Sequence, residues 1–576
     1  MSQSSDSSSC SSSPTSSPTS LQPNNIDPSS RWLVQKFGGT SVGRFAVNIA
    51  RDIVPDYIGS NKVAIVCSAR SESSKALGTT NLLLRAASET LRSSKNSSGT
   101  ATPISASPVS ERAGLGSWSP TSPRSPRGRQ EAPADHSDSP PPFLDTVDLI
   151  REQHLKAARA SVQDPGILDE LEAEIEQDCE WLRTFLYASH LINEISPRGK
   201  DTIVGLGERL MCKIMTAVLR DQGVDAEFVS LENILDDLES HEEDDSLDQD
   251  FYDRLSMAVG ERVKQCESRV PVVTGFFGPV PGSLLQQIGR GYTDLLAALL
   301  AVGLQASELQ VWKDVDGIFT ADPRKVPTAR LISVISPAEA AELTYYGSEV
   351  IHPFTMDQAI RRKIPIRIKN VKNPRGGGTV IHPDAEGNLM APVAVAGSVP
   401  EAPSLKLALL SARALQAKKH YKHPTAVTIK ERIIVLNVNS NRKSVSHGFL
   451  AGIFGTLDRY GVVVDLISTS EVHVSMAIEE NGLNKKIMDR LVRQLQHSGT
   501  VSVHTNMAIL SLVGQRMCHN IGVAGRMFDA LAQGKINIEM ISQGASEINI
   551  SCVIDEKDAV KALNVIHYSC LQTSDF

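Results

Sequence analysis

Aromatic residues are scarce in this chain, and its cysteines are few and scattered. Aromatic residues make up 5% of the 576 residues, and no two of the 8 cysteines form a Cys-x-x-Cys pair. Zinc sites and disulfide frameworks require regularly spaced cysteines, so we expect neither. No apolar run approaches the roughly 18 residues of a membrane span, and the N-terminus lacks the apolar core of a signal peptide. We therefore expect a cytoplasmic protein with free thiols and no membrane partner.

A large excess of one charge sign is also absent. The chain has 58 Lys and Arg residues against 66 Asp and Glu residues, a formal net charge of -8. The strongly basic surface that attracts nucleic acid is therefore not expected. Hydrophobic residues make up 41% of the chain, which is enough for ordinary globular cores. The length indicates several domains.

Two segments contain few apolar residues. Residues 1–30 are mainly Ser, Pro, Asn and Asp, and residues 93–142 contain repeated Ser-Pro pairs between arginines. Such segments bury too little apolar surface to offset their chain entropy. We expect a disordered N-terminal tail over 1–30 and a disordered insertion at about 93–142, inside a folded domain. The insertion is either a tolerated surface loop or a segment for phosphorylation or docking.

Outside these segments, strand-like and helix-like patterns alternate. Residues 32–37 and 63–68 are short apolar runs of the kind buried in parallel sheets, and residues 293–303 form an apolar helical run. Residues 202–206 also look like a strand, with a helix following over 208–222. This alternation predicts an α/β domain with a mostly parallel central sheet that helices cover on both faces.

The C-terminal part of the chain contains an internal duplication. Residues 431–496 and 508–566 both read as strand, helix, strand, strand and helix. The strand ends at 465–470 and 539–544 resemble each other in sequence. A repeated β-α-β-β-α unit predicts two small ferredoxin-like α+β modules.

A glycine-containing loop closes the first expected strand, with the sequence Lys36-Phe37-Gly38-Gly39-Thr40-Ser41. Glycines let the backbone approach phosphate oxygens, and the N–H groups of the following turn favour anions. The lysine precedes the glycines, so this is not a Walker A loop. By itself the loop predicts either a phosphate contact or a plain strand-to-helix turn.

Three further segments carry charged residues at turns or helix starts. Glu208 lies in Gly-Leu-Gly-Glu-Arg, where it either stabilises a helix dipole or binds an ammonium group. Arg290 suits a carboxylate, and Asp294 either orients the lysine or caps the helix that follows. Residues 313–324 form a long, charged, turn-rich loop after a strand, which suits a nucleotide.

Together these motifs resemble the aspartokinases, a family with the amino-acid-kinase fold. The lysine loop is followed in that family's order by the motifs at 207–209, 289–294 and 314–324, and then by Glu-Val-Ile-His-Pro at 349–353. The duplicated tail resembles the two ACT modules of the family. The resemblance implies a three-layer amino-acid-kinase domain over 31–395, a linker over 396–430, and ACT modules over 431–503 and 504–576.

The activity implied by the resemblance is transfer of a phosphoryl group from MgATP to the β-carboxylate of L-aspartate, giving 4-phospho-L-aspartate. This reaction would be the first step of threonine and methionine biosynthesis. Lys36 would neutralise the transferring group, and Asp294 would hold Lys36. Glu208 would bind the ammonium of aspartate, and Arg290 its α-carboxylate. Mg²⁺ would bridge the phosphates, so no dedicated protein metal site is expected. No dehydrogenase-like region follows the tail, so we expect a monofunctional enzyme.

The resemblance also implies a wider set of contacts. Residues matching the aspartate pocket are Thr40, Ser41, Ser68, Thr80 and Thr293. Residues matching the ATP and phosphate site are Gly38, Gly39, Lys313, Asp314, Phe319, Arg324 and His352. The role of His352 is open, since it either shapes the ATP site or is a structural histidine at the turn before Pro353.

Two positions depart from the pattern of bacterial members. Tyr292-Thr293 stands where Gly-Ser is usual, and Lys313 stands where a small hydroxyl residue is usual. Both changes resemble the fungal branch of the family. They leave the roles of Tyr292 and Lys313 less defined than those of the other motif residues.

The ACT modules are expected to bind an effector amino acid at strand-to-helix turns, and to join the subunits of a homo-oligomer. The matching residues are Ser446, Gly452 and Ile453 in the first module and Asn520 and Ile521 in the second. Backbone N–H groups at helix starts suit an α-carboxylate. Threonine is the expected effector, with lysine as the second candidate. A purely structural dimerisation domain is the alternative.

Two other functions fit parts of the pattern. One is a kinase of the same fold acting on glutamate, acetylglutamate, carbamate or UMP. The motifs at 207–209 and 289–294 and the two tail modules argue against it. The other is a catalytically dead amino-acid sensor. An inactive site has no physical need to keep Lys36, Glu208 and Asp294 together.

Overall fold

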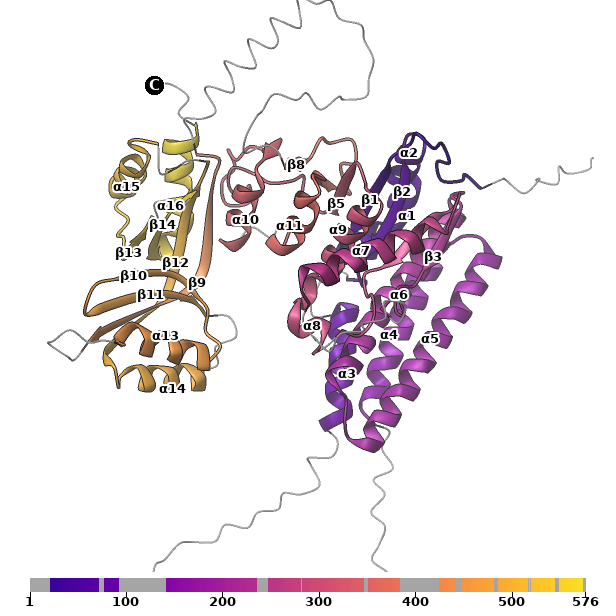
Figure 1. The fold of residues 1–576 in the computed structure, drawn as a ribbon, viewed down its shortest axis with the longest axis horizontal. Helices are drawn as coiled ribbons and strands as arrows, with labels where there is room; N and C mark the ends of the chain where they lie inside the picture. Colours follow the sequence, from indigo (N-terminus) through magenta and orange to yellow (C-terminus); the bar gives the residue numbers. More distant parts are fainter. Residues whose placement is uncertain are drawn as a thin grey trace, which may run out of the picture.

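The computed structural model describes residues 21–71, 77–92, 141–235, 247–280, 282–346, 351–383, 424–440, 448–480, 485–515, 517, 520–543 and 548–572. The side chain of Arg290 is outside this description. The predicted insertion at 93–142 lies almost wholly outside the described residues, as do residues 1–20 of the predicted tail. Figure 1 shows two parts that lie side by side, an N-terminal part (residues 21–383) and a C-terminal part (residues 424–572).

The N-terminal part is built on an eight-stranded sheet in the order β3-β4-β2-β1-β5-β7-β8-β6. All neighbouring strands run parallel except β7 and β8. The prediction of a mostly parallel sheet is therefore confirmed. The strands are β1 (Trp32–Phe37), β2 (Lys62–Cys67), β3 (Ala226–Val229), β4 (Val270–Thr274), β5 (Glu308–Lys313), β6 (Val334–Ile335), β7 (Ile366–Asn370) and β8 (Thr379–Ile381).

Helices cover both faces of this sheet, which confirms the three-layer prediction. Phe37 and Ile65 point into one core, while Val34 and Val66 point into the other. The first core is covered by α1 (Gly39–Asn48), α2 (Val54–Ile58), α3 (Thr79–Arg92), α4 (Phe143–Ser161), α5 (Pro165–Ile192) and α6 (Pro197–Asp221). The second is covered by α7 (Gln249–Lys264), α9 (Tyr292–Gly303), α10 (Pro337–Tyr345) and α11 (Pro353–Arg361).

The prediction of a strand over residues 202–206 is wrong, because these residues lie inside the continuous helix α6. The helix is buried on nearly all sides between residues 203 and 219, so its apolar residues do not show a helical period. Its glycines permit close packing. A Cβ at Gly205 would lie 2.5 Å from the ring of Phe276, and one at Gly207 would lie 3.1 Å from the Cβ of Ala69.

The prediction of disorder is also wrong for the last ten residues of the expected tail. The amide of Asn24 is buried, where its Nδ2 donates to the Val63 carbonyl and its Oδ1 accepts from the Val63 N–H. The backbone N–H of Gln22 donates to the carbonyl of Gly223 at 2.7 Å. These bonds attach the segment to β2 and to the end of α6, and they offset the chain entropy that composition alone leaves uncompensated.

The C-terminal part is one six-stranded antiparallel sheet in the order β10-β11-β9-β12-β14-β13. Its strands are β9 (Ala426–Ser440), β10 (Val464–Thr469), β11 (His473–Glu479), β12 (Gly499–Val513), β13 (Met540–Ser542) and β14 (Asn549–Asp555). Helices α13 (Phe449–Arg459) and α14 (Lys485–Leu495) pack on one half of the sheet. Helices α15 (Val523–Gln533) and α16 (Ala559–Ile566) pack on the other half, as Figure 1 shows in orange and yellow.

The long strands β9 and β12 each belong to both modules. Residues 426–430 of β9 pair with 509–513 of β12 in the second module, and residues 435–440 pair with 499–504 in the first. The expected linker therefore ends before Ala426, and the expected boundary at 503/504 falls inside β12. The second module needs the start of β9 as its fourth strand, a requirement that the separate repeat patterns do not reveal.

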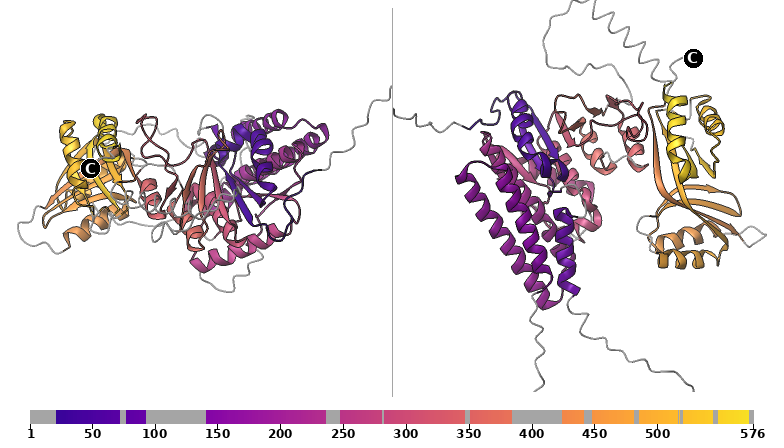
Figure 2. Two further views of the ribbon diagram at one scale, coloured as in Figure 1. Left: turned by 90° about the horizontal axis from the view of Figure 1, so that it is seen from above. Right: turned by 180° about the vertical axis from the view of Figure 1, so that it is seen from behind.

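The two parts of the chain are joined by a set of polar contacts around α10. Glu339 accepts hydrogen bonds from the Thr425 hydroxyl at 2.5 Å and from the backbone N–H of Gln515 at 3.1 Å. Asn549 donates to Glu342 at 2.7 Å. Figure 2 shows from two further directions that the parts lie side by side. Among the described residues, no helix is long and apolar enough to span a membrane.

Candidate active site

Lys36 and Asp294 form the centre of the candidate site. Lys36 is the next-to-last residue of β1, and Asp294 lies in the first turn of α9. The Lys36 Nζ lies 2.6 Å from the Asp294 Oδ1 as an ion pair, without the alignment of a hydrogen bond. Only 9% of the lysine side chain is exposed. The carboxyl ends of parallel strands are where α/β folds bind their ligands, and this pair lies at that edge.

The loop after β1 leads into a helix start with no side-chain cap. Gly38 is the N-cap residue of α1, and no side chain bonds to the first turn. A Cβ at Gly39 would lie 2.3 Å from the carbonyl oxygen of Ala69, so only glycine fits there. A Cβ at Gly38 would meet nothing closer than 4.0 Å. Gly39 thus serves packing, while Gly38 leaves the uncapped helix start open to an anion.

Glu208 projects from α6 into the same region. It is buried, and its Oε1 accepts a hydrogen bond from the hydroxyl of Thr293, the residue before Asp294. Its Oε2 has no well-formed hydrogen bond among the described residues. A Cβ at Gly275 would lie 2.7 Å from this oxygen, so a glycine at the end of β4 makes room for the carboxylate. A buried oxygen of this kind suits an incoming ammonium group.

The electrostatic environment of Glu208 is unusual. Burial raises the pKa of Glu208 from 4.5 to about 7, while the Thr293 hydrogen bond and the charge of Lys36 act in the opposite direction. Burial and the charge of Glu208 also raise the pKa of the neighbouring Tyr292. Strongly shifted groups in a ligand site are candidates for function. Thr293, predicted to contact the substrate, donates its hydroxyl hydrogen to Glu208, which suggests an indirect role.

The segment that carries Arg290 is anchored by a residue that the sequence did not single out. Asp201, near the start of α6, accepts hydrogen bonds from the Ser283 hydroxyl at 2.8 Å and the Leu284 N–H at 2.6 Å. These bonds fix the start of α8 (Leu284–Gln287), which leads directly to residues 289–291. Ser283 has φ +148°, a strained value for a residue other than glycine. No sequence pattern marks Asp201, because its partners are 82 residues or more away.

The other predicted aspartate contacts lie around this centre. The Ser68 N–H donates to the carbonyl of Phe37, so Ser68 follows β2 directly beside the end of β1. Thr80 is half-buried in the first turn of α3. The Ser41 hydroxyl donates to the Trp312 carbonyl, which attaches α1 to β5, and Thr40 is half-buried at the start of α1. The tight contacts of Gly207 with Ala69, Leu83 and Thr79 bring the β2 loop, α3 and α6 together.

A recess lies at the carboxyl ends of β5 and β7, next to the site around Lys36. It has a volume of about 270 Å³ and is lined by Asp316, Phe319, Leu331, Asn370, Asn373, Gly376 and Gly378. The side-chain amides of Asn370 and Asn373 both donate to the Asp316 Oδ1 at 3.2 Å. Since β5 is the neighbour of β1 in the sheet, the recess lies next to the Lys36 edge. Asp316 and Phe319 belong to the loop that the sequence predicted for a nucleotide, whereas the sequence motifs did not predict the other lining residues.

The predicted ATP residues differ in how they are placed. Phe319 lines the recess, Asp314 is exposed, and Lys313 is half-buried at the end of β5. Arg324 is largely exposed and pairs with Asp322 at 3.0 Å. To contact a phosphate, the Arg324 side chain would have to leave this partner.

Comparisons with known proteins identify the family of this chain. A model of the amino acid kinase family matches residues 31–370, and an ACT domain model matches residues 510–569. The aspartokinase of Schizosaccharomyces pombe is 50% identical over 548 residues, covering 95% of this chain and 94% of that protein. The chain belongs to the aspartokinase family.

Solved aspartokinase structures share the fold. E. coli aspartokinase III in complex with aspartate and ADP (R-state) matches with a TM-score of 0.60 at 25% identity, covering 94% of this chain and 99% of that chain. The same enzyme in complex with lysine and aspartate (T-state) matches with a TM-score of 0.63, with the same identity and coverage. The chain thus shares the fold of these aspartokinases over 94% of its length.

His352 has a structural contact in this aspartokinase-family chain. It is the N-cap residue of α11, and its Nδ1 accepts a hydrogen bond from the backbone N–H of Phe354 at 3.3 Å. The side chain is exposed. Of the two roles left open by the sequence, the capping contact supports the structural one.

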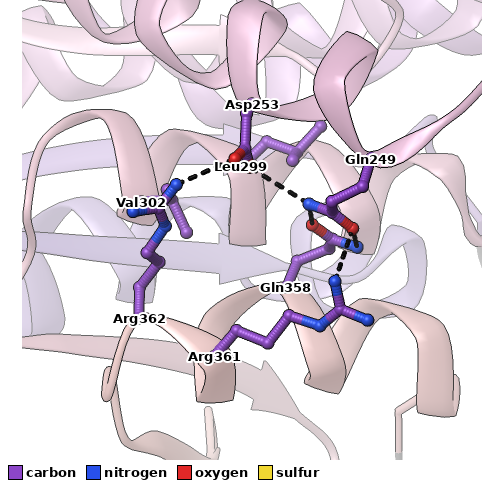
Figure 3. Close-up of a pocket in the computed structure, with 7 residues that line it drawn as sticks. All are labelled: Gln249, Asp253, Leu299, Val302, Gln358, Arg361 and Arg362. Carbon is purple, nitrogen blue, oxygen red and sulfur yellow. Dashed lines mark hydrogen bonds and ion pairs between the residues drawn. The ribbon is translucent and has the colours of Figure 1, made fainter.

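Another recess, lined mainly by polar side chains, lies between α7, α9 and α11, as Figure 3 shows. Arg362 pairs with Asp253 at 2.9 Å, and Gln249 forms hydrogen bonds with Gln358 and Arg361. These polar groups satisfy one another, so they hold α7 against α11. The recess also contacts Leu299 and Val302, toward the opposite end of α9 from Asp294. We assign it no part in aspartokinase chemistry.

The predicted effector turns show the same local geometry in both ACT modules. Gly448 before α13 and Gly522 before α15 are left-handed N-cap residues, with φ +85° and +86°, and no side chain in the described part of the chain caps either helix. Gly452 and Ile521 are exposed, whereas the side chain of Ile453 is fully buried, so only its backbone is available. The Asn520 Nδ2 is buried without a hydrogen-bond partner among the described residues. Ser446 lies outside the described residues.

Proposed function

We propose that this protein transfers the γ-phosphoryl group of MgATP to the β-carboxylate of L-aspartate, yielding 4-phospho-L-aspartate. The observation that carries the proposal is the meeting of a buried lysine, its carboxylate partner and a buried glutamate at one sheet edge. A donor of positive charge for the phosphoryl group and an acceptor for the substrate ammonium lie within one site. Membership of the aspartokinase family supports the choice of substrate.

The proposed chemistry requires positioning and charge more than covalent work. A β-carboxylate oxygen of aspartate attacks the γ-phosphorus, the bond from phosphorus to the β–γ bridging oxygen breaks, and ADP leaves with the electron pair. The carboxylate is already ionised, so no general base is required. Lys36 stabilises the charge on the transferring group, and Asp294 orients the lysine. The uncapped start of α1 adds N–H donors near Gly38.

Aspartate would be held at both ends of its backbone. Glu208 accepts the ammonium group, with Thr293 fixing the orientation of the glutamate. Arg290, on the segment anchored by Asp201, pairs with the α-carboxylate. Ser68, Thr80, Thr40 and Ser41 complete the pocket.

MgATP would extend from Lys36 across the carboxyl end of β5. We place the adenine ring in the 270 Å³ recess, where Phe319 offers an apolar ring contact. The Asp316 Oδ1 accepts the two asparagine amides, which leaves Oδ2 to accept from the exocyclic amine of adenine. Lys313, Asp314 and Arg324 would lie toward the phosphates. Mg²⁺ would enter with the nucleotide, held mainly by phosphate oxygens.

The function is tested by an ADP-release assay with purified full-length protein, MgATP and a panel of acids. We expect turnover with L-aspartate and less than about 1% of that rate with L-glutamate or N-acetylglutamate. One additional methylene would displace the carboxylate from its in-line position, because reacting atoms must lie within about 3.5 Å. Faster turnover of glutamate would favour the other kinases of this fold. Absence of turnover with every acid would favour an amino-acid sensor.

Threonine is the proposed feedback inhibitor, with lysine as the second candidate. The helix starts at Gly448 and Gly522, which no described side chain caps, suit an α-carboxylate. The Asn520 amide, which has no partner among the described residues, suits a further acceptor on the ligand. We expect millimolar threonine to lower activity and raise the midpoint of thermal unfolding, because a ligand stabilises the state it binds. Lysine serves as the matched control. If neither amino acid changes activity or unfolding, the ACT modules are structural.

We further propose that the protein is a cytoplasmic homo-oligomer joined through its ACT modules. Leu450 and Phe454 on α13 and Val463 before β10 are large apolar side chains left exposed in the first module. A second copy of the chain is the partner that would cover them.

A further inference from the structure

The loop that follows β5 is packed into the core of the second ACT module. Ala321 and Val326 from this loop are buried in the same cluster as Leu510, Ile566 and other residues of that module. The backbone N–H of Val427, in β9, donates to the Thr320 carbonyl at 2.8 Å. Phe319, the neighbour of Thr320, lines the recess proposed for the adenine ring. The two faces of one short loop therefore contact the nucleotide recess and the regulatory module.

The side chain of His567, in the regulatory module, contacts this loop at two points. It directly follows α16 and is fully buried. Its Nε2 lies 2.9 Å from the Thr320 hydroxyl, and its Nδ1 lies 3.4 Å from the Thr328 hydroxyl. One ring thus bridges two points of the loop that are eight residues apart.

The hydrogen bonds around Thr320 favour one arrangement of hydrogens on the His567 ring. Burial and the charge of Arg330 lower the pKa of His567, so the ring is neutral, with one donor and one acceptor nitrogen. The Thr320 hydroxyl oxygen accepts a hydrogen bond from the backbone N–H of Arg330 at 2.9 Å. We assign the Thr320 hydrogen to Nε2, which leaves the Nδ1 hydrogen to donate to Thr328. Arg330 in turn donates to the Leu571 carbonyl at 2.9 Å, beyond the same histidine.

We propose that His567 is a positioning residue for MgATP, which acts through Thr320 on the loop that holds the adenine ring. Nucleotide affinity in the N-terminal part would then depend on a side chain of the regulatory module that never touches the nucleotide. This inference rests on the proposed nucleotide site and adds a residue that no motif predicts. It also implies that a displacement of the end of α16 changes the nucleotide recess.

The experiment compares His567→Leu, which removes both ring hydrogen bonds, with His567→Gln, whose amide oxygen still accepts from Thr320. We expect His567→Leu to raise the KM for MgATP about tenfold, with kcat and the KM for aspartate changed less than about twofold. His567→Gln should recover most of the affinity. Thr320→Val removes the other partner of the same hydrogen bond, so it should raise the KM for MgATP as much as His567→Leu does. If His567→Leu fails to fold, Thr320→Val still tests the proposal.

Asn549→Ala is the control for a general loosening of the two parts, because Asn549 bonds to Glu342 of α10 and does not contact the loop. Its KM for MgATP should stay at the wild-type value. The proposal is overturned if the His567 and Thr320 variants leave this KM unchanged, or if Asn549→Ala raises it equally. Calorimetry of MgADP binding to the same variants tests the role of His567 even if the chain phosphorylates no acid. Failure of this proposal can therefore be distinguished from failure of the proposed function.

Discussion

Replacing Lys36 with methionine is expected to lower kcat about 1,000-fold, with little change in the KM for aspartate. Methionine has a similar length but no charge, so the transferring phosphoryl group loses its closest positive partner. Removal of one preorganised donor at a developing charge costs about 100- to 1,000-fold in other enzymes. The buried environment of Lys36 strengthens the effect, because water cannot replace the ammonium. Steady-state kinetics with saturating MgATP measures the change.

The matched control for this prediction is Asp294→Asn. It keeps the shape of the ion pair but removes the charge that orients Lys36. We expect a smaller loss in kcat, about 10- to 100-fold, because the lysine remains. Both variants should unfold at a lower temperature than the wild type, since removing one partner of a buried pair leaves the other uncompensated. A Lys36→Met variant that retains wild-type kcat would refute the role of Lys36.

Glu208→Gln is expected to raise the KM for aspartate about 100-fold. The glutamine keeps the size of the side chain and its contact with Thr293, but it cannot pair with an ammonium group. Truncating one side of a buried charged hydrogen bond typically costs about 2–5 kcal/mol. The KM for MgATP should change little, because the nucleotide recess lies on the other side of β1. An unchanged KM for aspartate would show that the ammonium group does not bind at Glu208.

The same substitution gives a second readout through pH. Only ionised Glu208 pairs with the ammonium, and its pKa is about 7. The KM for aspartate in the wild type should therefore rise about tenfold for each pH unit below 7. Because the fold raises this pKa above 4.5, the folded state favours the protonated form, and Glu208 lowers stability as pH rises from 4.5 toward 7. In Glu208→Gln, both pH dependences should be weaker. Steady-state kinetics at several pH values measures the KM, and thermal unfolding at pH 5 and pH 8 measures the stability.

The conservative control at this site is Thr293→Ser, which retains the hydroxyl that donates to Glu208. It should keep a KM for aspartate within about threefold of the wild type. Thr293→Val removes the hydrogen bond and should raise the pKa of Glu208 further, because that bond lowers the pKa. Its KM profile should then shift to higher pH. A Thr293→Val profile that coincides with the wild type would show that Thr293 does not orient Glu208.

Much of the fold and of the site chemistry was accessible from local sequence. The alternation of apolar runs with helical segments predicted the parallel sheet and its two helical layers, because a buried strand is apolar along its own length. The motifs around Lys36, Glu208 and Asp294 predicted groups that the fold brings together at one edge. The strand predicted at 202–206 was wrong because this part of α6 is buried on nearly all sides, and there local hydrophobicity does not separate strand from helix.

The sequence by itself determined the fold class, the duplicated tail and the residues that carry charge to the site, since these follow from composition and spacing along the chain. Only the tertiary structure decided how distant segments share one element or one contact. The start of β9 completes the second module, Asp201 anchors the Arg290 segment, and His567 reaches Thr320 across 247 positions. Such contacts leave no local pattern, because their free energy arises only when the folded chain brings the partners together.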